Sequence, residues 1–104
     1  MSLIHTDQMP WTDQERQGIS FWMRVEGKAQ DQPILVCASY VALEQLDLAQ
    51  VRDLRGAWTT FEANRSQIES AASHRYDAFG LPPDHGTFKG RPVLLLGAGS
   101  LLRN

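Results

Sequence analysis

Three stretches of the chain have the hydrophobic pattern of β-strands. Residues 19–26 alternate between apolar and polar positions, which predicts a half-buried strand. Its apolar side carries Ile19, Phe21, Met23 and Val25. The polar stretch 27–32 and the apolar run 34–38 follow, so the first two strands are predicted to form an antiparallel hairpin. Residues 93–96 are apolar throughout, which indicates a strand covered on both faces, in a sheet centre or at a dimer seam.

A helical pattern occupies the middle of the chain, from Asp47 to Gly80. Its apolar residues recur at intervals of three, four or seven and predict one long helix with an apolar stripe. They are Leu54, Trp58, Phe61, Ile68, Ala72 and Phe79. Asp47 and Gln50 form a pair like a capping box at its start, and Gly80 is placed to end it. Gly56 marks either close packing or a helix start nearer Arg55.

The remaining elements complete a small α+β fold. Ser39 is placed to cap a short helix at 40–46, and residues 3–6 add an edge strand. We therefore predict a small antiparallel sheet of about three to four strands packed against one long and one short helix. The length fits a single domain, 1–104, with 97–104 as a flexible tail.

Composition argues against two classes of partner. The formal net charge is −2 and the pI is about 5.8, with ten Lys and Arg residues scattered along the chain. A nucleic-acid binder needs a basic surface, and the sequence shows no basic cluster, so we do not expect this partner. No apolar run approaches the roughly 20 residues that span a bilayer, so we expect no membrane partner.

The cytoplasm is the expected location. The N-terminus has no basic segment followed by an apolar region, as a secretory signal would. Cys37 is the single cysteine, so an intramolecular disulfide cannot form. Its apolar neighbours indicate a buried thiol that acts as a small hydrophobe.

Candidate catalytic and metal-binding groups are sparse, and we expect no cofactor. His5, His74 and His85 have no second His or Cys at metal-ligand spacing. Asp84 beside His85 could serve acid–base chemistry, but a solvated loop is the favoured interpretation. Residues 97–100 imitate a dinucleotide-binding turn, yet too little chain follows for the helix and strand that this motif needs.

Arg65 is the anomaly of the predicted stripe, because a charge stands where an apolar residue is expected. Glu62 precedes it by three positions and Glu69 follows by four, so both carboxylates are within helical reach. In one interpretation Arg65 lies along the stripe and pairs at its edge. In the other, Arg65, Glu62 and Glu69 bind an anionic ligand in a cleft between helix and sheet.

Three residues are candidates for an interface. Trp22 lies on the polar side of the first strand, Trp11 lies near the start of the chain, and Leu95 belongs to the doubly apolar last strand. Covering by the long helix or the N-terminal segment is the favoured interpretation of Trp22, and an exposed binding surface is the alternative. A stacking platform for nucleic acid is not favoured, because no basic groove accompanies the tryptophans.

The helix pattern resembles that of a known family. The run Phe61-Glu62-x-Asn64-Arg65-x-x-Ile68-Glu69-x-Ala71-Ala72 is similar to one in small bacterial proteins of the domain of unknown function 1488 family. Further matches in the same order are Thr6-Asp7, Trp11, Ile19-Ser20-Phe21, Val36-Cys37 and Ala42-Leu43. The chain departs from the family pattern in a longer Pro/Gly loop before the last strand and in its C-terminal Gly-Ala-Gly-Ser. The resemblance implies an α+β fold with a small antiparallel sheet, a recurring Glu62, Arg65 and Glu69 pattern, and no established activity.

The sequence thus favours a small cytoplasmic protein without enzymatic activity that acts through a protein partner or as a homodimer. The basis is three tryptophans and a doubly apolar strand in a short chain that offers no convincing catalytic set. The alternative is a small-molecule binder, or a minor enzyme, that uses Arg65 with Glu62 or Glu69.

Overall fold

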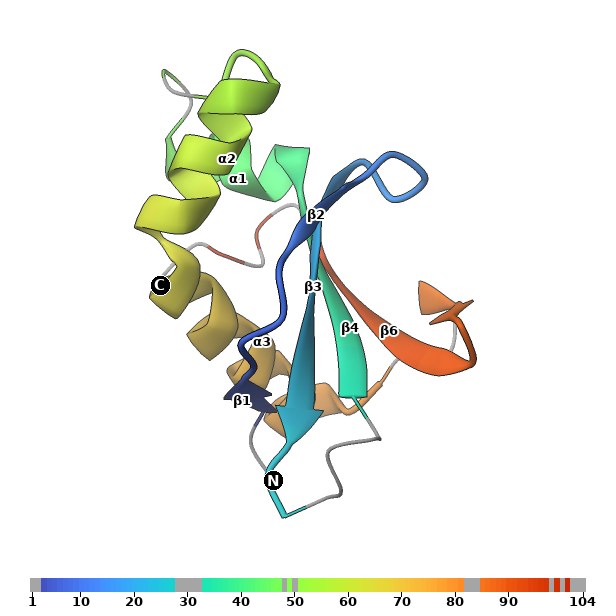
Figure 1. Cartoon of the computed structure of the whole chain (residues 1–104). Helices are drawn as coiled ribbons and strands as arrows, with labels where there is room; N and C mark the ends of the chain where they lie inside the picture. Colours follow the sequence, from blue (N-terminus) through green and yellow to red (C-terminus); the bar gives the residue numbers. More distant parts are fainter. Residues whose placement is uncertain are drawn as a thin grey trace.

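The computed structural model describes residues 3–27, 33–47, 49, 51–81, 85–97, 99 and 101. In chain order the elements are β1 (Leu3–His5), β2 (Trp11–Asp13), β3 (Gly18–Val25), β4 (Pro33–Ser39), α1 (Tyr40–Leu46), α2 (Leu54–Ala63), α3 (Arg65–Phe79), β5 (Thr87–Phe88) and β6 (Arg91–Leu96). The helices lie together on one side of the sheet (Figure 1). The predicted α+β class is confirmed.

The sheet is mixed and has six strands in the order β1-β3-β4-β6-β5, with β2 also paired to β3. Strand β3 runs antiparallel to β1, β2 and β4, whereas β4 and β6 are parallel. Our prediction of a purely antiparallel sheet of three to four strands is wrong in both size and direction. The three helices between β4 and β6 return the chain in its original direction, and parallel neighbours need such a crossover.

The strands that we did not predict are short. β2 has three residues and β5 has two, so neither is long enough to display an alternating pattern. β1 and β2 pair with opposite ends of β3, because the chain leaves the sheet between His5 and Trp11 and then rejoins it. One edge of the sheet is therefore built from two separate pieces.

The predicted long helix is two helices, α2 and α3, which meet at Asn64. This residue has φ −119° and ψ 17°, outside helical geometry, and its side-chain amide donates to the Thr60 carbonyl at 2.9 Å. Helix α2 starts at Leu54, with Asp53 as its cap: the Asp53 carboxylate accepts from the Gly56 N–H at 2.8 Å. The start predicted at Asp47 is wrong, whereas the alternative of a start nearer Arg55 is confirmed. Gln50 lies outside the described residues.

Two predicted helix ends are confirmed. The Ser39 hydroxyl accepts from the Ala42 N–H at 3.1 Å and starts α1. Gly80 ends α3 with φ 70°, a value that glycine adopts without a steric penalty.

The core lies between the sheet and the helices. The predicted apolar side of β3 is buried there, as are the stripe residues Phe61, Ile68 and Ala72. The stripe prediction is wrong at its two ends, since Leu54 is 51% exposed and Phe79 is 75% exposed. The break at Asn64 interrupts the helical phase, so residues far from it leave the buried side.

The opposite side of the sheet is also partly buried. Leu35, Cys37 and Val93 are 0%, 1% and 1% exposed, although they point away from the helices. As the apolar run 93–96 indicated, β6 lies inside the sheet, between β4 and β5. Val93, Leu94 and Leu96 are buried, whereas Leu95 on the side away from the helices is half-buried.

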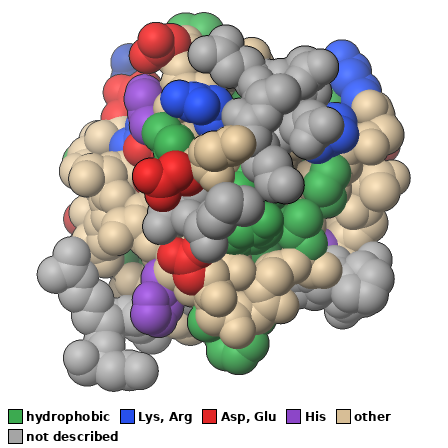
Figure 2. Space-filling model, turned by 90° about the horizontal axis from the view of Figure 1, so that it is seen from below, with side chains coloured by type: hydrophobic (Ala, Val, Ile, Leu, Met, Phe, Trp, Pro, Cys, Tyr) green, Lys and Arg blue, Asp and Glu red, His purple; other side chains and the backbone are tan. Residues whose placement is uncertain are grey.

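Figure 2 views the molecule from the end at which β3 finishes and β4 begins. Hydrophobic side chains form a patch on this end, with acidic, basic and histidine side chains around it. This end therefore does not present a surface of a single charge.

Part of segment 97–104, predicted as a flexible tail, is described. Leu101 is 2% exposed and belongs to the core cluster, and the Gln67 side chain donates to its carbonyl at 3.2 Å. The Gly99 N–H donates to the Gln45 side chain at 2.6 Å. Residues 98, 100 and 102–104 lie outside the described residues.

Among the helices that the structure describes, none combines the length and apolarity that crossing a membrane requires.

Candidate functional site

The side of the sheet that faces away from the helices, called here the outer face, carries three aromatic rings in mutual contact. The ring centroids of Trp11 and Trp22 are 6.0 Å apart, and Phe88 lies 5.8 Å from Trp11 and 5.9 Å from Trp22. All three residues are half-buried, so part of each remains accessible to a partner. We call Trp11, Trp22 and Phe88 the aromatic cluster.

Strand register and sheet curvature bring these rings together. Trp11 pairs with Ser20, which precedes Trp22 by two positions on β3, so both indoles leave the same face. Phe88 belongs to β5, at the opposite edge of the sheet from β2. Contact between Phe88 and Trp11 therefore requires the sheet to curl until its two edges approach across the outer face.

A tight turn aims Phe88 toward the tryptophans. Phe88 pairs with Arg91 across a two-residue turn, in which Lys89 has φ 50° and Gly90 has φ 77°. Positive φ at both turn positions is the requirement of the type I′ hairpin, whose twist matches that of the strands. The turn also leaves Lys89 beside the ring of Phe88.

Two cations contact the aromatic cluster. The Arg16 guanidinium carbon lies 5.3 Å from the Phe88 centroid, and the Lys89 ammonium nitrogen lies 5.5 Å from it. Both distances are within the range of cation–π attraction. Arg16 also donates to the Thr87 carbonyl at 3.3 Å, which ties the turn after β2 to β5.

A buried carboxylate holds Arg16 in place. Asp13 is 6% exposed; its Oδ2 accepts from the Ser20 hydroxyl at 2.7 Å and from Arg16 Nη1 at 3.0 Å, and its Oδ1 accepts from the Arg16 N–H at 3.1 Å. Burial by itself raises the pKa of the Asp13 carboxyl, but the hydrogen bonds from Ser20 and Arg16 outweigh burial and hold that pKa below its usual value. Asp13 is therefore a carboxylate at neutral pH and holds Arg16, which contacts Phe88 of the aromatic cluster.

We predict that Asp13→Asn lowers the free energy of unfolding at pH 7 by about 2 kcal/mol, because hydrogen bonds to a charged group are lost. The folded-state pKa of Asp13 lies below its unfolded value of about 4, so this stabilisation is complete above the unfolded pKa. It is lost as the pH falls through the folded pKa. Between pH 7 and pH 2, the free energy of unfolding measured with urea should therefore fall less in Asp13→Asn than in wild type.

The control for this prediction is Glu15→Gln, which neutralises an exposed carboxylate two residues away. At pH 7 its unfolding free energy should stay within about 0.5 kcal/mol of wild type. If Asp13→Asn and Glu15→Gln behave alike, the buried network does not stabilise the fold.

The thiol near this network is not a nucleophile. Cys37 is buried, and burial raises the pKa of its thiol to about 11. Burial also raises the pKa of the Tyr40 hydroxyl. Both groups stay protonated at neutral pH, so neither is an activated nucleophile.

Of the residues proposed for an interface, the structure brings Trp11 and Trp22 into contact and places Leu95 on the same face. Leu95 is half-buried and pairs with Cys37 of β4. Its N–H donates to the His85 side chain at 3.0 Å. Sequence reasoning missed Phe88. The sequence Thr87-Phe88-Lys89-Gly90-Arg91 has the glycine of a two-residue hairpin turn, which could have revealed β5.

Arg65 lies between the helices and the sheet. Its guanidinium carbon is 5.6 Å from the Phe21 ring and 5.8 Å from the Phe61 ring, and its Nε donates to Glu69 at 3.3 Å. The same Glu69 oxygen lies 2.6 Å from Nδ1 of His5 on β1. These contacts join α3 to the sheet edge.

Glu62 is not in the same helix as Arg65, because the chain breaks at Asn64. It is exposed on α2, whereas Arg65 and Glu69 lie in the first turns of α3. The structure therefore brings Arg65 and Glu69 together, as predicted. The predicted helical pairing of Glu62 with Arg65 is wrong, because the two residues belong to different helices.

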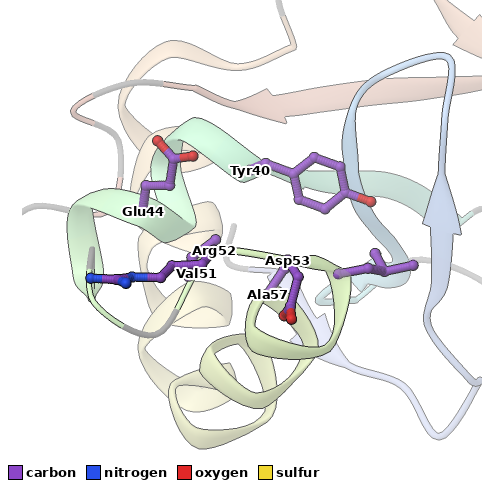
Figure 3. Close-up of a pocket in the computed structure, with 7 residues that line it drawn as sticks. Tyr40, Glu44, Val51, Arg52, Asp53 and Ala57 are labelled. Atoms are coloured by element: carbon purple, nitrogen blue, oxygen red, sulfur yellow. The ribbon is translucent and has the colours of Figure 1, made fainter.

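A small hollow lies between α1 and the start of α2 (Figure 3). Its volume is about 220 Å³, and it is lined by Tyr40 and Glu44 of α1 and by residues 51–54 and Ala57. Pockets for drug-sized ligands measure about 300–1,000 Å³, so this hollow is smaller. Sequence reasoning named none of its residues as a site.

Within the described residues, no group of three His, Cys, Asp or Glu side chains could hold a metal ion. His85 is half-buried with its ring bonded to β6, rather than solvated in a loop as expected; its neighbour Asp84 lies outside the described residues. The structure therefore gives His85 a local structural contact.

Compared with protein-family models, curated proteins and solved structures, the chain has no significant match.

Proposed function

We propose that this protein acts by binding a macromolecular partner, without catalysis, and that the outer face around the aromatic cluster is the contact surface. The observation that carries the proposal is the meeting of Trp11, Trp22 and Phe88, from three distant segments, as half-buried rings in contact. Tryptophan and arginine are the residue types that most often dominate binding energy at interfaces. A second protein or a second copy of this chain, the partners suggested by the sequence, fall within this proposal.

Two further observations support binding over chemistry. The Cys37 thiol is buried and protonated at neutral pH, and the hollow between α1 and α2 is smaller than an ordinary ligand site. We place the protein in the cytoplasm within this proposal, where a lone thiol such as Cys37 stays reduced.

An anionic ligand at Arg65 is the rival function, and one observation favours it. Arg65 Nη2 is buried and has no hydrogen-bond partner among the described residues. A buried donor without an acceptor is costly, and an anion could satisfy it. The guanidinium nevertheless lies against Phe21 and Phe61, so a ligand would have to part the helices from the sheet. The aromatic cluster is open to a partner without such a change, and we favour it for this reason.

The direct test is Trp22→Ala, compared with Phe79→Ala as a control. Removing a tryptophan that anchors an interface costs about 2 kcal/mol of binding or more, a loss of roughly 30-fold in affinity. Phe79 is 75% exposed on α3, and truncating it removes aromatic surface elsewhere. Light scattering over a concentration series would measure self-association, and immobilised protein would measure retention of partners from a lysate.

We expect Trp22→Ala to lose association while Phe79→Ala keeps it, with both variants folded by circular dichroism. A wild-type protein that is monomeric at every concentration and retains no partner would contradict the proposal. Equal association of the two variants would move the contact surface away from the aromatic cluster.

A further inference from the structure

We propose that the partner of the outer face is single-stranded nucleic acid, whose bases stack on the aromatic cluster and whose phosphates pair with the basic side chains around it. This inference rests on the proposed function, because it names the partner of the same surface. It departs from our expectation from the sequence, in which the basic residues are scattered.

The folded sheet gathers those scattered charges on one face. Among the described residues, strand register and ring contacts place Arg16, Arg24, Lys89, Arg91 and Asp13 there. Glu26 follows the last residue of β3 and continues the polar side of that strand, so it adds a second carboxylate. Asp13 is 6% exposed and already bonded to Arg16, and Glu26 offsets one of the other three basic residues, so the described part of the outer face keeps a net positive charge. The whole chain has a formal net charge of −2, so the sign of this face is opposite to that of the molecule. Such a face attracts a polyanion.

Of these three cations, Lys89 contacts a ring of the aromatic cluster, and strand register places Arg24 and Arg91 near Trp22 and Phe88. Arg24 lies two positions from Trp22 on the same face of β3, Arg91 pairs with Phe88, and Lys89 contacts the Phe88 ring. Arg91 is held by a hydrogen bond from its Nε to the Pro33 carbonyl at 3.0 Å, and a guanidinium carries further N–H donors on its terminal nitrogens. Rings and cations close together on one face suit a single strand, because it carries both bases and phosphates.

Unpaired bases use both features of the face. Every base has a flat π surface that can stack on an aromatic side chain, and this binding tolerates many sequences. A duplex buries those surfaces within its own stack, so it can use only the cations. An acidic protein segment likewise uses the cations and has no need of several ring faces. The combination of three accessible rings with three nearby cations therefore favours single-stranded nucleic acid.

Fluorescence anisotropy with a labelled oligothymidylate of about 20 nucleotides tests this inference. The matched variants are Lys89→Glu on the outer face and Arg55→Glu on the helix side, since each reverses one exposed cation. At about 50 mM salt we expect Lys89→Glu to weaken binding roughly tenfold and to lower the salt slope by about one unit or more. Arg55→Glu should bind as wild type does.

Trp22→Ala adds the test of stacking, and Lys89→Glu keeps the inference testable if Trp22→Ala unfolds. Binding should also quench tryptophan fluorescence, because two of the proposed stacking residues are tryptophans. Failure of wild type to bind the oligothymidylate at about 50 mM salt would overturn the inference. Equal affinity for a duplex of the same length, or for polyglutamate, would also overturn it, because only charge would then be recognised.

The same variants separate this inference from the proposed function. If oligothymidylate does not bind but Trp22→Ala abolishes self-association, the outer face binds a second copy of this chain and only the inference fails. If neither oligothymidylate nor a second copy binds and no other partner is retained, both fail.

Discussion

Gly18→Ala is expected to destabilise the protein by about 3 kcal/mol or more, because no space exists for a side chain at this position. A Cβ atom would stand 2.4 Å from the Ala38 carbonyl oxygen, 2.9 Å from the Ala38 carbonyl carbon and 2.8 Å from the Cys37 sulfur. The carbonyl belongs to the neighbouring strand β4, so it cannot retreat without disturbing the pairing of β3 and β4. Thermal and urea unfolding would measure the loss.

Gly97→Ala is the matched control, because a Cβ atom there would meet nothing within 4 Å. It should change the unfolding free energy by only a few tenths of a kcal/mol. Equal melting temperatures for Gly18→Ala and wild type would show that β3 and β4 are further apart than the structure places them. The test also bears on the candidate site, since Gly18 pairs with Asp13, whose carboxylate holds Arg16 beside the aromatic cluster.

Phe61→Ala is expected to lower the free energy of unfolding by about 3–5 kcal/mol, the usual cost of removing a buried phenyl ring. Phe61 is 0% exposed, and its ring lies 5.4 Å from Phe21 on β3 and 5.9 Å from Trp58 on α2. It is also one of the two rings that cover the Arg65 guanidinium. Its loss would therefore open a cavity and uncover a partly buried charge at the same time.

Phe79→Ala is the control for Phe61→Ala, because it makes the same substitution at a 75% exposed position. Its unfolding midpoint in urea should stay close to that of wild type. A small effect of Phe61→Ala, similar to that of Phe79→Ala, would mean that α2 does not close over the sheet as described. If Phe61→Ala binds an anion that wild type does not bind, this would support the rival function, in which Arg65 binds an anionic ligand.

These variants test different parts of the molecule. Gly18→Ala and Phe61→Ala address the two sides of the sheet, whereas Trp22→Ala and Lys89→Glu alter the accessible surface. If the core variants lose stability and the surface variants lose only binding, the division into a supporting fold and a binding face is established.

Much of the fold follows from local patterns. The alternation at Ile19–Val25 predicts β3 and its buried side, and Ser39 and Gly80 mark helix ends that the structure confirms. These signals are readable because periodicity and capping depend on residues only a few positions apart. The interruption at Asn64 escaped prediction because neither Gly nor Pro stands there, and its non-helical geometry is visible only in the structure.

The candidate site joins residues that are too far apart in the sequence for any local pattern to relate them. Trp11 and Trp22 were proposed as separate interface residues, and the antiparallel register of β2 and β3 makes them neighbours. Phe88 was missed because β5 has only two residues, and because its ring reaches Trp11 only when the sheet curls.

The sequence by itself determined the α+β class, the central strands, the N-cap of α1, the C-terminal end of α3 and the burial of Cys37. The tertiary structure alone decided that β4 and β6 are parallel, that Arg65 lies against Phe21 and Phe61, and that scattered aromatic and basic residues share one face. The physical reason is that hydrophobic periodicity and capping act over a few residues, whereas register and curvature depend on how distant strands pack together.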